Sequence, residues 1–191
     1  LQVAQTIEAA KPAQAIIDVT DNLGGLLESA LQTANLFVEG VPLIQVKSPK
    51  HPLETKTADQ AATFAKLPLT LWVNHKTASA AEVFALSMQT NNRAKILGTQ
   101  TYGKGTVQQV FPLPDGRALK FTVASYLSSS GEPINEIGVK PDGPIDTDLQ
   151  RRFAELSSSS DAQVDENTVQ QISPNSDSGD MEFEDSLSHS E

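Results

Sequence analysis

Cysteine is absent from this sequence of 191 residues, which excludes disulfide bonds, a thiolate nucleophile and cysteine metal ligands. No apolar run approaches the roughly 18 residues that a membrane-spanning helix needs. Glycine-rich phosphate loops are missing too, and the three histidines are scattered, with no carboxylates clustered around them at metal-ligand spacing. We therefore expect no metal and no other cofactor.

Lysine and arginine are absent after Arg152. Residues 1–153 contain 14 acidic and 14 basic residues, so the net charge of −10 belongs to the part that follows. A domain without net positive charge has no electrostatic attraction for nucleic acid, and we expect none as a partner. The acidic end has few large apolar residues and cannot bury enough surface to offset its chain entropy. We therefore predict a folded domain over residues 1–150 and a disordered acidic tail over residues 151–191, with a docking or targeting role for the tail as the alternative.

Short apolar segments and helical periodicities follow one another along the domain. Strands are predicted over residues 15–19, 42–44, 69–74, 94–98, 107–113, 118–126 and 138–140. Helices are predicted over residues 1–10, 26–36 and from 79 onward, with a further short helix near 58–64 inside a polar loop over 47–66. Strand–helix units followed by a β-hairpin predict an α/β domain with a mixed sheet and packed helices.

The stretch from Leu71 to Glu82 carries the first candidate for chemistry. A buried strand ends, the chain turns through small residues, and a helix begins at Ser79. Free backbone N–H groups and the positive end of the helix dipole gather at such a point. A serine there can attack a carbonyl group while nearby amides bind the oxyanion, as at a nucleophile elbow. The alternative is structural, because Ser79 and Glu82 also form the pattern of a capping box.

A possible base for this serine lies between two glycines. Lys104 is flanked by Gly103 and Gly105, which leave little bulk around it and permit unusual backbone angles. A lysine acts as a general base only when desolvation or a nearby positive potential favours its neutral form. Gln108, four residues on, could orient the amine without adding a charge. The alternative is a surface lysine on a glycine turn.

Together these stretches resemble the carboxy-terminal processing, or tail-specific, serine peptidases. In that family a Ser-Ala-Ser-Ala-Ser-Glu-like segment holds the nucleophile, and a Phe/Tyr-Gly-Lys-Gly-x-Val-Gln segment holds a lysine and a supporting glutamine. The matching segments here are Thr77-Ala78-Ser79-Ala80-Ala81-Glu82 and Tyr102-Gly103-Lys104-Gly105-Thr106-Val107-Gln108. The resemblance implies that Ser79 and Lys104, separated by 25 positions, form the catalytic pair and that Gln108 supports the lysine.

Three flanking segments extend the resemblance over about residues 1–143. Residues 113–122 are similar to the family's Leu-x-Asp-Gly-x-Ala-Leu-Lys-Leu-Thr hairpin, and residues 138–142 to its Gly-Ile/Val-x-Pro-Asp ending. Residues 17–25 are similar to its Leu-Asp-Leu-Arg-x-Asn-Pro-Gly-Gly turn, whose second glycine helps form the oxyanion hole. The resemblance thus implies that the amides of Gly25 and Ala80 hold the oxyanion.

The chain departs from the family pattern in two places. Thr20 stands where the family usually has Arg, and Leu23 where it has Pro, which affects the shape of the turn before Gly25. No counterpart of the family's upstream PDZ domain is present. The first residues, Leu1-Gln2-Val3-Ala4, read like the interior of a helix, so we expect the N-terminal part of the peptidase core to be missing as well.

Other side chains offer rival chemistry at this site. His75 lies four residues before Ser79, but a turn separates them where a Ser–His pair would need helical spacing. Lys76 is a rival base by proximity, but it lies in a polar turn and is expected to face water. His51 is placed in a loop and His189 in the tail.

The resemblance implies a Clp-protease/crotonase-like α/β core and a serine endopeptidase that cuts proteins with unstructured, apolar C-terminal tails. It also implies a location outside the cytoplasm, in the periplasm, the cell envelope or the thylakoid lumen. The alternatives are a non-catalytic ligand-binding module on the same fold, like the retinoid-binding relatives of these peptidases, and an acyl-CoA enzyme of crotonase type. The intact Ser79, Lys104 and Gln108 favour the peptidase. No oligomeric state is predicted.

Overall fold

The computed structural model describes residues 2–159, which divide into two compact units. The first unit ends at Thr147 and contains every strand of the described part. The second begins at Asp148 and contains nearly all of helix α4 (Thr147–Ser159). No described helix is both long and apolar enough to span a bilayer.

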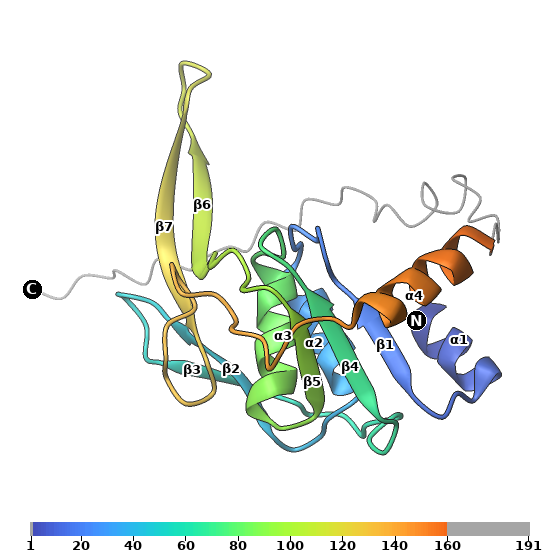
Figure 1. Ribbon diagram of the computed structural model, residues 1–191. Coiled ribbons are helices and arrows are strands. Elements are labelled where there is room, and N and C mark those ends of the chain that lie inside the picture. The colour runs from blue at the N-terminus through green and yellow to red at the C-terminus, as the bar shows by residue number, and fades with distance from the viewer. Residues whose placement is uncertain (1, 160–191) are drawn as a thin grey trace, which may run out of the picture. The chain divides into compact units, whose positions relative to one another are not determined.

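Three parallel strands form the first sheet, in the order β1-β4-β5 (Figure 1). They are β1 (Ala15–Asp18), β4 (Leu69–Val73) and β5 (Ala94–Gly98). The middle strand β4 is a run of apolar residues with four of its five side chains buried, as expected for a strand covered on both faces. Asp18 pairs with Trp72, so the turns that follow β1 and β4 begin side by side at one edge of the sheet.

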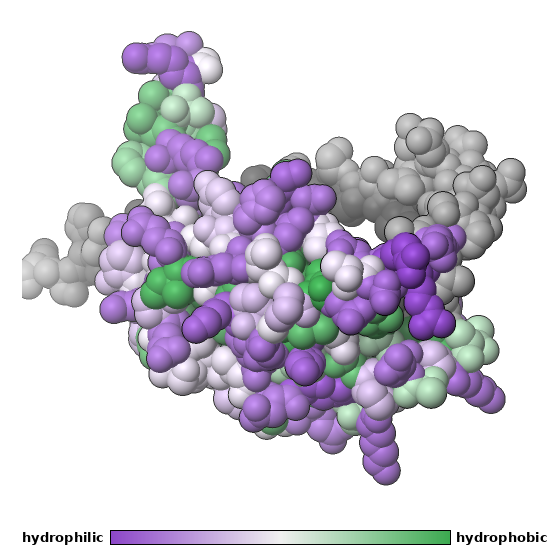
Figure 2. Space-filling view, in the orientation of Figure 1, coloured by the Kyte–Doolittle hydropathy of each residue, from purple (hydrophilic) through white to green (hydrophobic). Residues whose placement is uncertain are grey.

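Four antiparallel strands form a second sheet, in the order β3-β2-β7-β6. They are β2 (Pro42–Lys47), β3 (Glu54–Thr57), β6 (Thr106–Pro112) and β7 (Ala118–Leu127). The β6–β7 hairpin extends away from the rest of the first unit (Figure 1). Figure 2 shows an apolar band on this hairpin below a polar tip. The exposed apolar residues of the hairpin are Val110, Phe111, Leu119 and Phe121.

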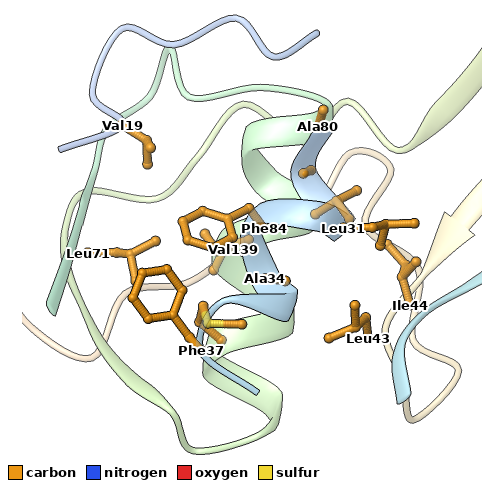
Figure 3. Close-up of a cluster of buried hydrophobic side chains, with 14 of the residues drawn as sticks. Val19, Leu31, Ala34, Phe37, Leu43, Ile44, Leu71, Ala80, Phe84 and Val139 are labelled. Carbon is orange, nitrogen blue, oxygen red and sulfur yellow. The ribbon is translucent and has the colours of Figure 1, made fainter. Parts of the chain in front are cut away.

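Helix α3 (Ala80–Thr90) occupies the centre of the first unit. It contacts helix α2 (Leu27–Asn35) and one strand from each sheet, β2 and β5. Eight of its eleven residues are buried, and most of them are apolar or small, as expected for a helix covered on nearly every side. Figure 3 shows Phe84 of α3 among the side chains of α2, Leu71 and Val139. Because α3 is buried, the residues at its N-terminus are held in a fixed position.

The α/β class with packed helices is confirmed, but several elements differ from the prediction. The parallel and antiparallel strands belong to separate sheets. The polar loop predicted over 47–66 contains β3, which is stabilised by pairing with β2, and no helix forms over 58–64. Residues 138–140 form no strand. Instead, Gly143 forms an isolated parallel β-bridge with Leu97 of β5.

Helices also form at both ends of the described chain. The predicted N-terminal helix is present as α1 (Gln2–Ala10). Helix α4 (Thr147–Ser159) extends into the first part of the predicted tail, and the boundary at residue 150 stays a prediction. The remainder of the predicted tail, residues 160–191, lies outside the described residues.

Candidate active site

Ser79 has a strained backbone at the start of α3. Its φ of 55° and ψ of −123° are unfavourable for a residue with a side chain, whereas an ordinary N-cap residue is extended. Such conformations persist only where the surrounding contacts impose them, and they concentrate at functional sites. A sharp strand-to-helix turn of this kind presents the serine of a nucleophile elbow. The backbone geometry therefore favours a nucleophile over a simple helix cap.

Glu82, one turn into α3, is fully buried and binds both candidate segments. Its Oε2 accepts hydrogen bonds from the amides of Ser79, at 2.9 Å, and Lys104, at 2.8 Å. Its Oε1 accepts from the Gly103 amide, at 2.6 Å, and the Thr101 hydroxyl, at 2.5 Å. A buried carboxylate needs partners of this kind to offset its lost hydration. Glu82 thus holds the Lys104 backbone beside the Ser79 backbone.

The glycines around Lys104 are explained by a second chain segment that packs against them. A Cβ atom on Gly105 would lie 2.3 Å from the amide nitrogen of Asn135, and one on Gly103 would lie 3.1 Å from the Glu136 carbonyl carbon. Gly103 also has a φ of +85°, which disfavours side chains. The Glu136 amide donates to the Gly103 carbonyl oxygen at 2.8 Å. The Lys104 loop is therefore fixed on one side by Glu82 and on the other by this segment.

The side chains of Lys104 and Gln108 are exposed. Within the described part of the chain, the Lys104 amine takes part in no ion pair and no hydrogen bond, and no hydrogen bond joins it to Ser79 or Gln108. Gln108 lies on β6, just past a bulge in its pairing with β7. The structure brings the backbones of Ser79 and Lys104 together, while the contact between their side chains and the supporting role of Gln108 stay predictions.

The turn after β1 packs directly on the nucleophile segment. The Ala78 amide donates to the Asn22 carbonyl oxygen at 2.9 Å, and the Gly24 amide donates to the Asn22 side-chain oxygen at 2.9 Å. A Cβ atom on Gly24 would lie 2.8 Å from the Ala80 nitrogen. Among the described residues, no acceptor binds the amides of Gly25 and Ala80. These two amides are available for an oxyanion, which remains their predicted role.

A pocket of about 260 Å³ opens next to these amides. Its walls come from β1, the turn after β1, α2 and the first turns of α3, and most of its lining side chains are apolar or small. The hydroxyl of Thr33 in its wall already donates to the Ser29 carbonyl oxygen at 2.7 Å. The pocket therefore suits an apolar side chain. Its lining residues are Ile17, Val19, Asn22, Gly24, Gly25, Leu26, Ser29, Ala30, Thr33, Ala80, Ala81 and Phe84.

The rival side chains lie elsewhere. His51 and His75 are exposed, and His189 lies outside the described residues. The Lys76 amine is paired with Asp21, 3.2 Å from its Oδ1. Hydrogen bonds from Asn74 and Lys76 hold the pKa of Asp21 below its usual range, so this carboxylate stays charged near neutral pH. The Lys76 amine is therefore already engaged in an ion pair, whereas among the described residues the Lys104 amine is not.

The sequence pattern indicates Glu82 only as part of a helix cap, and it gives no sign of the roles of Thr101 and Asn22. A signal for Glu82 is present, because it is the one charged residue of a helix made mostly of apolar and small residues. The partners of Asn22 and Thr101 could not be found in this way. The hydrogen bonds that tie them to the site, from Ala78 to Asn22 and from Thr101 to Glu82, join residues far apart along the chain.

We expect Gly24→Ala to disrupt the candidate oxyanion hole. The added methyl group would lie 2.6 Å from the Ala78 carbonyl oxygen and 2.9 Å from Ser79 Cβ, so the turn must move away. Loss of one oxyanion donor costs about 10²–10³-fold in turnover. The matched control is Gly116→Ala at the hairpin tip, where φ is similarly +81° but no atom lies within 4 Å. Peptide cleavage by the full-length variants measures the effect, and equal activities would contradict the proposed packing.

Known proteins resemble most of this chain in sequence. Residues 2–145 match the model of peptidase family S41. A CtpA-like serine protease of Staphylococcus epidermidis is 38% identical over 134 residues, covering 69% of this chain and 27% of that protein. A carboxyl-terminal-processing protease of Synechocystis sp. is 35% identical over 148 residues, covering 78% of this chain and 34% of that protein. The chain thus spans between about a quarter and a third of these relatives.

A solved structure shares the same fold. The photosystem II D1 C-terminal processing protease superposes with a TM-score of 0.70 at 33% identity, covering 76% of this chain and 38% of that one. The family resemblance drawn from Ser79, Lys104 and the flanking turns is thereby confirmed by independent comparisons of sequence and of fold.

Proposed function

This chain belongs to peptidase family S41, and from that membership we propose that the protein is a serine endopeptidase with Ser79 as nucleophile and Lys104 as general base. The observation that carries the proposal is the shared carboxylate of Glu82, which ties the strained Ser79 turn to the Lys104 loop. Two segments far apart in sequence are thereby held together at the end of a buried helix, next to two free amides.

The proposed reaction proceeds through an acyl-enzyme. The neutral Lys104 amine takes the proton of the Ser79 hydroxyl as its oxygen attacks a peptide carbonyl carbon. The amides of Gly25 and Ala80 stabilise the resulting oxyanion. The Lys104 ammonium group then gives its proton to the leaving amine as the peptide bond breaks. Lys104 next activates water, which hydrolyses the ester and returns Ser79 to its starting form. No metal or organic cofactor takes part in these steps.

Lys104 must be neutral to accept a proton. Its side chain is exposed, so bound substrate can cover it. Desolvation favours the uncharged form of an amine. A peptide lying across the Lys104 loop would exclude water from the amine at the moment when the substrate carbonyl reaches Ser79. We therefore assign the desolvation of Lys104 to the bound substrate, with Gln108 as the neutral group that orients the amine.

The proposed substrate is a protein with an unstructured, apolar C-terminal tail. A flexible segment can reach the strained turn without unfolding a domain, and the pocket beside Gly25 and Ala80 suits an apolar side chain next to the cleaved bond. The similar protein of Synechocystis sp. is named a carboxyl-terminal-processing protease, which supports this choice of substrate. A location outside the cytoplasm is proposed on the same family grounds.

The proposal is tested by acylation of the serine. We expect a fluorophosphonate probe to label the full-length protein at Ser79, identified by peptide mass spectrometry, because the probe reports an activated serine hydroxyl. Ser87→Ala, which removes a buried serine hydroxyl elsewhere on α3, should label like the wild type. A folded wild-type protein that does not label at Ser79 and does not cleave peptides with apolar C-termini would instead favour a ligand-binding module.

A further inference from the structure

The turns after β1 and β4 are joined by a set of hydrogen bonds that the proposed reaction does not use directly. Asn74, the first residue after β4, lies at its centre. Its side-chain oxygen accepts from the amides of Lys76 at 3.0 Å, Thr77 at 3.2 Å and Asp21 at 3.1 Å. Its side-chain amide donates to Asp21 Oδ1 at 3.1 Å. Asn74 therefore folds its own turn and binds the neighbouring turn through two bonds to one residue.

Thr77 continues this connection into the interior. It is fully buried, and its hydroxyl donates to the Val19 carbonyl oxygen at 2.8 Å and accepts from the Asn74 amide at 3.0 Å. Its carbonyl oxygen accepts from the Tyr102 amide at 3.0 Å. We call Asn74, Asp21 and Thr77 the turn clasp. It contacts all three segments of the proposed site. These are the turn after β1 that holds Gly24 and Gly25 (the oxyanion turn), the turn after β4 that ends at Ser79 (the nucleophile turn) and the Lys104 loop.

The two turns contain strained residues that need such support. Asp21, Gly24 and Ser79 all have positive φ, at +58°, +91° and +55°. Non-glycine residues keep such angles only where neighbouring contacts impose them. Position 23 inside the oxyanion turn is leucine, so no proline ring presets the backbone there. Before Leu23, hydrogen bonds join Asp21 to Asn74 and Asn22 to Ala78. After it, Gly24 packs closely against Ala78 and Ala80. These contacts on both sides of Leu23 therefore determine where the Gly25 amide lies.

We propose that Asn74 is a positioning residue that sets the distance between the oxyanion turn and Ser79. It acts through Asp21 and Thr77 and does not touch the substrate. The inference rests on the proposed function, because its purpose is to align the Gly25 and Ala80 amides with the oxygen of an attacked carbonyl. Displacement of a reacting group by about 1 Å can cost about 10²-fold in rate, so small movements of these turns matter.

Asn74→Ala in the full-length protein tests this inference. We expect kcat for an apolar peptide to fall by about 10- to 100-fold with KM within about twofold of the wild type, because substrate still binds but the oxyanion is poorly held. The affinity for a peptide aldehyde, which forms a tetrahedral adduct with a serine, should fall by the same factor as kcat/KM. Hydrogen–deuterium exchange should rise in both turns, over residues 19–25 and 74–80.

Two further variants separate positioning from general destabilisation. Asp21→Asn keeps an acceptor for the Asn74 side-chain amide and tolerates positive φ, so it should retain most of the wild-type kcat. Asn91→Ala is the matched control, since Asn91 also makes two side-chain hydrogen bonds, to the carbonyl oxygens of Pro42 and Ser87, but lies at the far end of α3. It should leave kcat and the exchange of both turns unchanged.

The outcomes distinguish failure of this inference from failure of the proposed function. Wild-type kcat and wild-type exchange in Asn74→Ala would overturn the positioning role, as would a parallel loss of kcat in Asn91→Ala. If the wild-type protein neither labels at Ser79 nor cleaves peptides, the proposed function fails. In that case, hydrogen–deuterium exchange in Asn74→Ala still tests the turn clasp. Faster exchange in both turns would support its role in holding them together, and faster exchange confined to residues 74–80 would overturn that role.

Discussion

Lys104→Ala in the full-length protein is expected to abolish peptide cleavage while leaving the fold intact. The exposed side chain makes no hydrogen bond within the described residues, and its amide, which binds Glu82, is present in any variant. Stability should therefore stay within about 0.5 kcal/mol of the wild type, as for other surface substitutions. Removing a general base costs about 10²–10⁴-fold in rate, and more when the base also activates the nucleophile.

Two variants distinguish a base from a positive charge. Lys104→Arg keeps the charge and length but cannot lose its proton in a protein, so it should be as inactive as Lys104→Ala. Lys140→Ala, at another exposed lysine, is the matched control and should retain wild-type turnover. Initial rates on a peptide with an apolar C-terminus provide the measurement. Full activity in Lys104→Ala together with loss in Lys76→Ala would assign the base to Lys76 and end the present proposal.

Glu82→Ala is expected to lower both stability and activity strongly. It would leave the amides of Ser79, Gly103 and Lys104 and the hydroxyl of Thr101 without their acceptor in the interior. Breaking a buried charged network typically costs about 3–5 kcal/mol of unfolding free energy. With nothing to join them, the Ser79 and Lys104 segments should separate, and turnover should fall by about 10²-fold or more.

Glu82→Gln tests the same network with almost no change of shape. Each carboxylate oxygen accepts at least one backbone N–H group, so the new NH₂ group must face a donor whichever way the side chain turns. We expect the free energy of unfolding to fall by about 1.5–3 kcal/mol, the contribution of a hydrogen bond to a charged group. Urea denaturation followed by the fluorescence of Trp72, which is almost fully buried, measures it.

Ser87→Ala provides the control for a buried polar side chain on the same helix. Its hydroxyl oxygen lies 2.7 Å from the Val83 carbonyl oxygen and 3.1 Å from that of Leu43, so its one proton is shared between them. Its removal leaves no backbone donor unpaired. We expect the free energy of unfolding to fall by about 1 kcal/mol and turnover to stay unchanged. If Glu82→Gln behaved like Ser87→Ala in both measurements, Glu82 would be a helix cap and not the link between the two segments.

Local pattern was sufficient for the elements that begin and end at sharp sequence signals. The apolar run of β4, the helical spacing after Ser79 and the Pro-Asp-Gly turn of the hairpin each depend on neighbouring residues, and each forms close to its predicted position. Strand β3 is not evident from the sequence because residues 54–57 contain no apolar residue and so show no apolar alternation; pairing with β2 holds the strand. Helix α4 is likewise not evident from the sequence, because its composition is largely polar.

The sequence by itself determined that the chain is an α/β domain and that Ser79 and Lys104 are its candidates for chemistry, because period, turn residues and motif spacing are properties of short segments. Only the tertiary structure decided how these candidates are joined. The carboxylate of Glu82, the close approach of Asn135 to Gly105 and the Asn74–Asp21 bonds all connect residues that are distant along the chain. Contacts of this kind depend on how the sheets and α3 pack, which no local pattern encodes.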